Sequence, residues 1–340
     1  MKIEIEERIL HFKQPAGTSR GVYTTRKIWL LTISDGGRTG IGECAPLPQL
    51  SCDDIEDYAA VLRKFCDQIE DSGVIPYEKM RPYPSMLFGV ETAFEQLKHT
   101  DGLVFDTPFS HGEEGIPING LVWMGTHDEM LERLKEKLAL GFRCVKLKIG
   151  AIDFQKELDL IQHIRKHFSR DKVELRVDAN GGFTPEVALD RLQELARYDI
   201  HSIEQPIMAR QWAEMARLCQ LSPLPIALDE ELIGVNTKAG KIQLLDTIKP
   251  KYIILKPSLH GGVAGTREWI ELANERGIGS WITSALESNI GLNAIAQLAA
   301  DIYGPQITMP QGLGTGMLFS DNIDMPLEIR NDCLWITIRS

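Results

Sequence analysis

The sequence lacks the features that would place the chain in a membrane, on a nucleic acid or around zinc. No uninterrupted apolar stretch reaches the roughly 18 residues that a membrane span requires. Acidic residues outnumber basic ones by 48 to 37, so the formal net charge is -11, and no long basic run offers a surface to nucleic acid or an anionic membrane. The six cysteines are scattered without a C-x-x-C pair, which favours free thiols over a zinc site.

The N-terminus, M-K-I-E-I-E-E-R, also lacks the apolar core of a signal peptide, and we therefore expect a cytoplasmic protein. With 340 residues, of which 43% are hydrophobic and 25% charged, the chain is long enough for a barrel plus a smaller domain. The composition favours a small-molecule partner, and the sequence leaves a homo-oligomer open.

Three predicted strands each end on an acidic residue. V-E-L-R-V-D ends on Asp178, I-H-S-I-E ends on Glu204, and L-P-I-A-L-D ends on Asp229. A single acid at such a position would most often form a turn or cap a helix. The repetition favours a shared function instead.

Two further predicted strands deliver lysines. C-V-K-L-K-I-G places Lys146 and Lys148 on one face of a strand before the three acids, and Y-I-I-L-K-P places Lys256 after them. Two lysines in this pattern often mark a solvated edge strand, but inside a barrel unpaired ammonium groups are unfavourable. The sites recur every 25 to 30 residues or so, roughly one strand–helix unit of an eightfold barrel, whose active site lies at the C-terminal ends of the strands. We therefore expect all these side chains around one mouth.

The alternation of short buried strands with helices predicts a parallel α/β barrel over residues 115–316. Its first strand is expected at 118–123, and its closing strand, near Ile307, is the least clearly defined. The barrel helices are expected at 126–140, 153–168, 185–198, 209–221, 238–247, 265–276 and 289–303.

Residues 1–114 predict a smaller α+β domain. Its N-terminal part reads as two strands joined by a loop over 14–23, followed by a hairpin at Asp35-Gly36-Gly37. Helices are expected at 53–72 and 84–99. The C-terminal segment, 317–340, ends in the strand-like L-W-I-T-I, which we expect to return to this domain.

The three acids supply only oxygen donors, which suits a hard cation such as Mg²⁺, for which Mn²⁺ could substitute. Asp178, Glu204 and Asp229 are therefore the predicted metal ligands. A lysine acts as a base only when it is neutral, a form that burial and neighbouring positive charges favour. We expect Lys148, beside Lys146, to be the base and Lys256 to face it across the metal. This arrangement favours removal of a proton next to a carboxylate group.

The motifs K-L-K, D-A-N, E-Q-P, D-E and K-P occur in this order and resemble the motif set of the enolase superfamily, in its muconate-lactonizing branch. The resemblance covers nearly the whole chain. It implies a modified TIM (β/α) barrel under an N-terminal α+β capping domain that the C-terminal segment completes.

A narrower resemblance is to the o-succinylbenzoate synthase family, carried by G-E-C-A-P-L-P-Q-L-S, T-S-A-L-E-S and Q-G-L-G-T-G-M-L-F-S-D-N. It implies metal-dependent dehydration of 2-succinyl-6-hydroxy-2,4-cyclohexadiene-1-carboxylate to 2-succinylbenzoate in menaquinone biosynthesis. Lys148 would take the proton next to the ring carboxylate and then help the hydroxyl group leave. Lys256 would lie against the other ring face as a cation over a π system.

Substrate-binding residues are expected around the same mouth. The turn H-G-G-V-A-G opens a helix, and free N–H groups at Gly261 and Gly262 could hold the succinyl carboxylate, although a plain tight loop is equally consistent. Either Ser284 or Ser288 could instead cap a helix. The complete predicted substrate set is Asn180, Glu230, Gly261, Gly262, Ser284, Glu287 and Ser288.

Two loops, Pro15 to Val22 and Ala45 to Ser51, are predicted lids, with plain surface connections as the alternative. His163 and His167 have the spacing of a metal pair, but we expect their helix to lie on the barrel exterior, where they would be solvated surface residues.

Two other functions stay open on the sequence. One is a racemase or epimerase of the same branch, in which Lys148 and Lys256 exchange an α-proton from opposite faces of an N-succinylamino acid or a dipeptide. The segment P-Q-G-L-G-T-G lacks the Asp-x-Asp expected of a dipeptide epimerase, which does not count against an N-succinylamino acid racemase. The other is a non-catalytic barrel that binds a metabolite through a metal, although binding alone would not require two opposed lysines.

Overall fold

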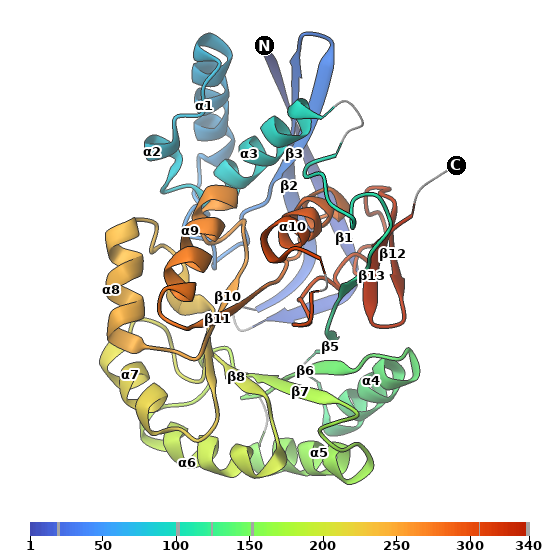
Figure 1. Ribbon diagram of the computed structural model, residues 1–340, viewed down its shortest axis with the longest axis vertical. Coiled ribbons are helices and arrows are strands. Elements are labelled where there is room, and N and C mark those ends of the chain that lie inside the picture. The colour runs from blue at the N-terminus through green and yellow to red at the C-terminus, as the bar shows by residue number, and fades with distance from the viewer. Residues whose placement is uncertain (19–20, 100–102, 124, 151–152, 306, 338–340) are drawn as a thin grey trace.

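The computed structural model describes residues 1–18, 21–99, 103–123, 125–150, 153–305 and 307–337. Its centre is a curled parallel sheet of seven strands, in the order β11-β10-β9-β8-β7-β6-β5 (Figure 1). The strands are β5 (Gly120–Val122), β6 (Cys144–Lys148), β7 (Glu174–Asp178), β8 (Ser202–Glu204), β9 (Ile226–Leu228), β10 (Tyr252–Leu255) and β11 (Gly279–Ile282).

Two isolated parallel bridges join the edges of this sheet and close the barrel. Gln311 pairs with Ile118, and Gly312 pairs with Thr283. A side chain on Gly312 would have its Cβ 2.0 Å from Thr283 Oγ1, so the close approach requires glycine. The prediction of a closing strand near Ile307 is therefore wrong by a few residues, because two bridges replace a regular strand.

Helices follow the strands and cover the outside of the sheet (Figure 1). Each predicted barrel helix is present, with ends that differ by a few residues. They are α4 (His127–Ala139), α5 (Phe154–His167), α6 (Pro185–Leu195), which η1 (Ala196–Tyr198) extends, α7 (Trp212–Leu221), α8 (Lys238–Ile248), α9 (Gly262–Asn274) and α10 (Asn289–Tyr303), with η2 (Glu230–Leu232) after β9. None of the helices in the described ranges is long and apolar enough to cross a membrane.

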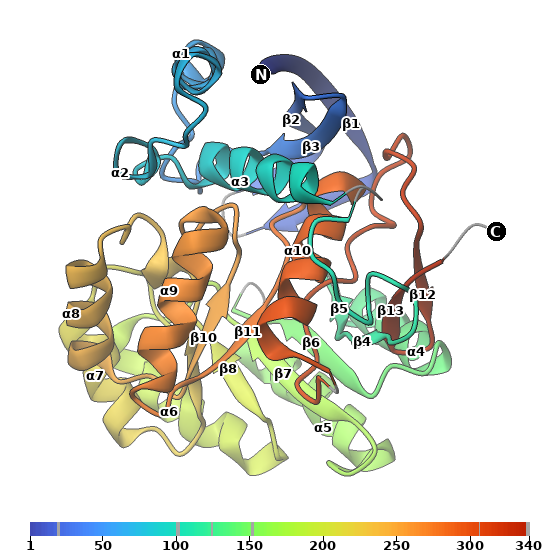
Figure 2. The same ribbon diagram turned by 45° about the horizontal axis from the view of Figure 1, so that its top comes forward.

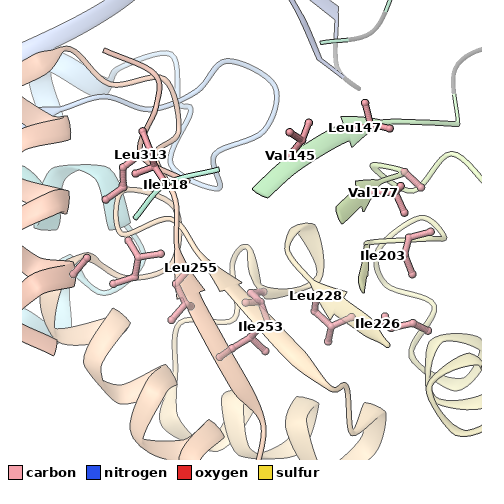
Figure 3. Close-up of a cluster of buried hydrophobic side chains, with 14 of the residues drawn as sticks. Ile118, Val145, Leu147, Val177, Ile203, Ile226, Leu228, Ile253, Leu255 and Leu313 are labelled. Carbon is pink, nitrogen blue, oxygen red and sulfur yellow. The ribbon is translucent and has the colours of Figure 1, made fainter. Parts of the chain in front are cut away.

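Side chains point alternately to the two faces of each strand, and this alternation sets the direction of the site residues. Leu147, Val177 and Ile203 are fully buried and point into the cluster between sheet and helices (Figure 3). Because successive strand residues face opposite ways, the neighbouring lysines and acids point into the barrel. A one-residue shift in register would turn the lysines and acids toward the helices and the apolar residues into the barrel.

The N-terminal domain is an antiparallel sheet of β1 (Lys2–Thr18), β2 (Gly21–Asp35) and β3 (Arg38–Cys44), with the helices α1 (Tyr58–Ser72), α2 (Tyr77–Met80) and α3 (Pro84–Lys98). The short α2 was not predicted from the sequence. Figure 2 shows α3 lying between this sheet and the ends of α9 and α10. The domain therefore covers one end of the barrel.

The loop predicted over 14–23 is wrong. The two strands continue through it, with Ala16 paired to Tyr23, after a register shift between His11 and Ala16. Pro15 lies within that shift, where a strand tolerates a residue without an N–H group. Residues 19 and 20 of the predicted lid lie outside the described residues.

The C-terminal strands β12 (Leu327–Arg330) and β13 (Cys333–Ile336) pair with β4 (Ile116–Pro117). L-W-I-T-I, which we expected to return to the N-terminal domain, thus pairs with β4. An earlier part of the segment contacts that domain instead, since Lys13 N donates to Leu318 O at 2.8 Å and Ser320 N donates to His11 O at 2.9 Å. The domain limits at residues 114 and 316 stay predictions.

Candidate active site

The register of the parallel strands brings the predicted residues to one end of the barrel. Lys148 lies beside Asp178 on the next strand, and Asp178 lies beside Glu204. Asp229 and Lys256 directly follow β9 and β10, the next two strands. All five therefore surround the C-terminal mouth, as the spacing predicted.

Two lysines of β6 bind the acids of β7 and β8. Lys146 Nζ lies 2.8 Å from Glu204 Oε2 and 3.2 Å from Asp178 Oδ2. Lys148 Nζ lies 2.8 Å from the same Asp178 oxygen and donates to Asn180 Oδ1 at 2.6 Å. Asn180 thus contacts the predicted base directly.

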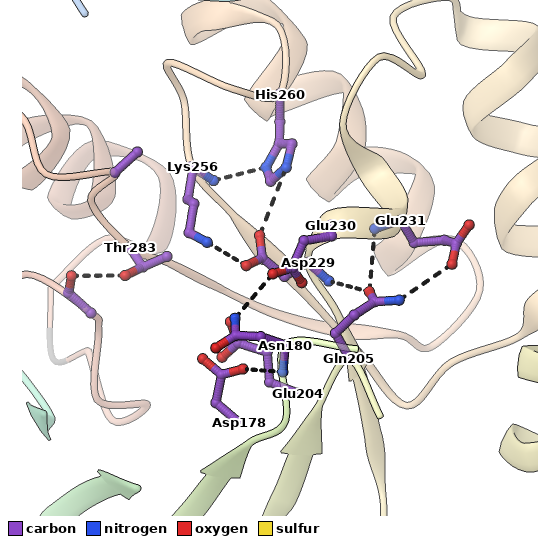
Figure 4. Close-up of polar contacts among 12 residues, drawn as sticks. Asp178, Asn180, Glu204, Gln205, Asp229, Glu230, Glu231, Lys256, His260 and Thr283 are labelled. Carbon is purple, nitrogen blue, oxygen red and sulfur yellow. Dashed lines mark hydrogen bonds and ion pairs between the residues drawn. The ribbon is translucent and has the colours of Figure 1, made fainter. Parts of the chain in front are cut away.

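Lys256 pairs with Asp229 Oδ2 on the β9–β10 side of the mouth (Figure 4). Asn180 Nδ2 donates to Glu230 Oε1 at 3.0 Å, which links the two sides. The three lysine side chains keep 11–14% of their area exposed, whereas the three predicted metal ligands keep at most 2%. A ligand entering the mouth would therefore meet the lysine ends.

Electrostatics keeps two of the lysines charged. Burial lowers the pKa of Lys146, but the carboxylates of Glu204 and Asp178 outweigh it and raise that pKa well above its usual value. Burial likewise lowers the pKa of Lys256, and Asp229 and Glu204 raise it further than burial lowers it. Lys146 and Lys256 are therefore suited to act as cations.

The acids of the mouth repel one another. Burial, reinforced by the charge of Asp178, raises the pKa of Glu204 to about 8. Burial and the charge of Asp229 raise the pKa of Glu230 to about 7. Burial also acts to raise the pKa of Asp178, but Lys148 and Lys146 hold it below its usual range. A cation bound among these groups would reduce the repulsion.

The donor set fits a hard divalent cation. Within the described residues, Glu204 Oε1, Asp229 Oδ1 and Glu230 Oε2 are buried and have no hydrogen-bond partner. Unpaired buried oxygens are unfavourable, and carboxylate oxygens are the ligands that Mg²⁺ prefers. In the described part of the chain, no three His, Cys, Asp or Glu side chains are already arranged as metal ligands, and other oxygens of the acids pair with lysines. The fit therefore rests on two predicted ligands, Glu204 and Asp229, together with Glu230. Both oxygens of Asp178 have partners, so its place among the ligands stays a prediction.

Two polar residues of the site were not predicted. Gln205 Oε1 accepts the N–H groups of Asp229 and Glu231 at 3.3 and 3.2 Å, so it fixes the backbone that carries a predicted ligand. His260 is fully buried beside Lys256 and Asp229, and burial lowers its pKa to about 3. Gln205 could have been noticed as the residue that follows Glu204 in E-Q-P, and His260 as the first residue of H-G-G-V-A-G, of which only the glycines were singled out.

Comparison with known proteins agrees with this geometry. Residues 129–337 match the family model described as "Enolase C-terminal domain-like", and residues 18–97 match "MenC, N-terminal domain". The chain belongs to the enolase superfamily. It is 44% identical to the o-succinylbenzoate synthase of Desulfotalea psychrophila, with 99% of each chain covered.

Other members of the superfamily share the fold. The crystal structure of MenC from D. psychrophila superposes with a TM-score of 0.84 at 40% identity, covering 99% of each chain. The muconate lactonizing enzyme of Pseudomonas putida superposes with a TM-score of 0.80 at 21% identity, covering 99% of this chain and 94% of that one. The L-Ala-D/L-Glu epimerase of Bacillus subtilis is 25% identical, with 88% of this chain and 84% of that protein covered. The predicted fold class and family are confirmed.

Several residues of this enolase-superfamily chain that were predicted to bind substrate also have structural partners. Ser288 caps α10, accepting from Ile290 N at 3.1 Å, and also contacts Glu43 of the capping domain. Glu287 accepts from Ser258 Oγ at 2.5 Å and from Ala285 N at 2.6 Å. Ser288 thus caps a helix, and a substrate contact of Ser288 or Glu287 stays a prediction.

The glycine turn after Lys256 does not present the free N–H group that we predicted at Gly262. Gly262 N donates to Pro257 O at 2.8 Å, and Glu91 of the capping domain accepts the next two N–H groups of α9. Gly261 lines a cavity of about 60 Å³ that contains no other predicted site residue. That cavity is lined by Tyr77, Arg81, Leu87, Asn236, Gly261, Ala264, Gly265 and Glu268.

The remaining predictions concern Ser284, the segment from Ala45 to Ser51, and the two histidines of α5. Ser284 Oγ lies 2.6 Å from Thr315 Oγ1. The segment from Ala45 to Ser51 is fixed to the barrel by the buried Arg26, which donates to Ala45 O at 2.6 Å and to Leu286 O at 3.1 Å. Whether this segment acts as a lid stays a prediction. His163 and His167 are exposed on α5, as expected.

Proposed function

We propose that this chain is an o-succinylbenzoate synthase, which removes water from 2-succinyl-6-hydroxy-2,4-cyclohexadiene-1-carboxylate to give 2-succinylbenzoate. The observation that carries the proposal is the full-length 44% identity to a protein of that name, combined with a mouth that holds three lysines and three acids. The product ring is aromatic, so loss of one proton and one hydroxyl group from neighbouring carbons completes the reaction.

Lys148 is the proposed acid–base residue. Its amine takes the proton from the carbon next to the ring carboxylate, and the C–H electron pair moves toward that carboxylate. The resulting ammonium group then gives a proton to the hydroxyl on the adjacent carbon, the C–O bond breaks, and water leaves from the same face. Asn180 Oδ1, 2.6 Å from Lys148 Nζ, orients the amine.

The other charged groups stabilise the negative charge that develops on the substrate. Asp178, Glu204 and Asp229 would hold a divalent cation, which supplies positive charge against a substrate carboxylate when bound. Lys146 adds a fixed ammonium group deeper in the barrel. Lys256, on the side of Asp229, presents its ammonium group to the other face of the ring.

The test is an ultraviolet assay of the purified protein with Mg²⁺ and the cyclohexadiene substrate. We expect rapid substrate loss, and we expect Lys148→Ala to lower kcat by about 10²–10⁴-fold, the range for loss of a general acid–base residue. Treatment with EDTA should also abolish turnover. Lys135→Ala is the matched control, because Lys135 lies exposed on α4, outside the mouth.

Absence of turnover by intact, Mg²⁺-loaded protein would refute the synthase proposal. Deuterium exchange into an N-succinylamino acid would then test the second candidate, an N-succinylamino acid racemase. Two lysines that approach from different strands suit proton exchange at an α-carbon. The absence of Asp-x-Asp from P-Q-G-L-G-T-G favours an N-succinylamino acid over a dipeptide as the substrate. Failure of both assays with retained Mg²⁺ binding would favour a non-catalytic metabolite-binding barrel.

The proposal includes finer statements that stay predictions. These are a role in menaquinone biosynthesis, Mg²⁺ as the metal with Mn²⁺ as a possible substitute, and a cytoplasmic location, whereas the oligomeric state is left open. The small-molecule carboxylate substrate is supported by the lysines that line the mouth.

A further inference from the structure

His260 forms a defined tautomer at the centre of the site. Its Nδ1 accepts the backbone N–H of Lys256 at 2.9 Å. A backbone amide can only donate, so Nδ1 carries no proton, the ring is neutral, and its single proton is on Nε2. The side chain is fully buried, so this proton has no access to bulk water.

The Nε2 proton faces an oxygen that also lacks a partner. Asp229 Oδ1 lies 3.9 Å from His260 Nε2, and neither atom has a hydrogen-bond partner within the described residues (Figure 4). A buried donor and a buried acceptor that are both unpaired are each unfavourable. An approach of about 1 Å would join them in a hydrogen bond of ordinary length.

The turn that carries His260 fixes the ring in this place. Leu259 N and His260 N both donate to Lys256 O, at 2.8 and 2.9 Å. Ser258, inside the turn, is held by Glu287 at 2.5 Å. The ring therefore lies between the backbone of Lys256, which it contacts, and the carboxylate of Asp229.

We propose that His260 is a positioning residue, whose Nε2–H orients the Asp229 carboxylate through one lone pair of Oδ1, so that Oδ2 faces Lys256 and the other lone pair of Oδ1 stays open to a cation. A neutral donor suits this task, because it orients the carboxylate without neutralising its charge as an ammonium group would. The inference rests on the cation site of the proposed function, but it does not depend on the identity of the substrate.

Replacing His260 with Asn or with Gln distinguishes the contact of the ring with Lys256 from its proposed contact with Asp229. In His260→Asn the amide oxygen takes the place of Nδ1, so the contact with Lys256 N–H is kept and the donor to Asp229 is lost. In His260→Gln the amide nitrogen takes the place of Nε2, so that donor is kept. We expect His260→Asn to weaken Mn²⁺ binding by about 10–100-fold, the range for loss of a partner of a metal ligand, and His260→Gln to weaken it less.

Mn²⁺ binding is measured by electron paramagnetic resonance titration without substrate, and circular dichroism checks that each variant is folded. Equal Mn²⁺ affinity in the parent protein and His260→Asn would overturn the inference. Failure of the parent protein to bind Mn²⁺ would refute the cation site and this inference with it, whereas failure of the dehydration assay alone would leave both standing.

The tautomer is tested on the parent protein, so the inference can be refuted even where a variant does not fold. Long-range ¹H–¹⁵N correlation spectra of the histidine rings should show a neutral ring protonated at Nε2 that is absent from His260→Asn and His260→Gln. A ring protonated at Nδ1, or at both nitrogens, would contradict the proposed contact with Asp229.

Discussion

Buried acids occupy two regions of the molecule and have different partners in each. At the barrel mouth, Glu204 and Asp229 pair with lysines through one oxygen, and the other oxygen of each has no partner among the described residues. At the interface between the capping domain and the barrel, both oxygens of Glu43 accept hydrogen bonds from the first turn of α10. Both oxygens of Glu91 accept N–H groups of α9, at 2.5 and 3.0 Å.

The difference shows that burial alone does not identify a functional acid. An acid whose oxygens are all occupied by N–H and hydroxyl donors joins two elements and has no capacity for a ligand. An acid that pairs one oxygen with a lysine and leaves the other oxygen without a partner can bind a cation. The glycines around the interface acids fit this account, since a side chain on Gly262 would place its Cβ 2.2 Å from Glu91 Oε2.

The largest effect should follow from changing an acid of the mouth. We expect Glu204→Gln to lower kcat by about 10³-fold or more, since it removes one of three charged oxygen ligands, the residues through which a bound metal acts. Thermal stability should change little, because relief of the repulsion from Asp178 offsets loss of the ion pair with Lys146. The ultraviolet assay measures kcat, and calorimetry measures thermal stability. Loss of stability with full activity would reverse the assignment of Glu204.

An intermediate effect should appear in the pH dependence of stability. Burial raises the pKa of Glu91 to about 8, from an ordinary value of 4.5. Between these pH values the folded protein binds more protons at this site than the unfolded chain, so Glu91 makes stability fall as pH rises from about 4.5 to about 8. Glu91→Gln should therefore flatten the stability–pH curve in this window by up to about 1.4 kcal/mol per pH unit.

Urea denaturation at a series of pH values measures the effect of Glu91. Glu56→Gln, on the exposed surface of the same domain, serves as the control and should leave the curve unchanged. A curve for Glu91→Gln that parallels that of the parent protein would mean that Glu91 is ionised throughout. In that case the helix N-terminus, which favours an anion, would outweigh burial.

The sequence alone was sufficient to predict the mouth, because its geometry follows from local rules. Parallel strands end at one edge of the sheet, and alternation determines which residues face inward, so the positions of Asp178, Glu204 and Lys148 required no knowledge of distant contacts. The barrel helices were predictable for the same reason, since their apolar periodicity lies within single segments.

Contacts between distant segments could not be predicted in this way. Glu43 meets Ser288 across 245 residues and Glu91 meets Val263 across 172, and neither pairing leaves a periodic pattern in the sequence. Ser288 was therefore singled out with two alternative roles. The C-terminal strand was identified correctly as a strand, but its pairing with β4 was not predicted, because β-strand patterning does not specify the partner.

The smallest effect should follow from changing an acid of the interface. Glu43→Gln replaces one oxygen with an amide group that must face an N–H or hydroxyl donor of Ser288 or Gly291. We expect a loss of about 1–3 kcal/mol in the free energy of unfolding, with kcat close to that of the parent protein, because an unpaired buried donor is unfavourable and the mouth is unchanged. Glu7→Gln, on the exposed part of β1, should change stability by at most about 0.5 kcal/mol. A fall in kcat larger than the fall in folded fraction would show instead that the interface acids also shape the mouth, and the two groups of buried acids would then form one functional unit.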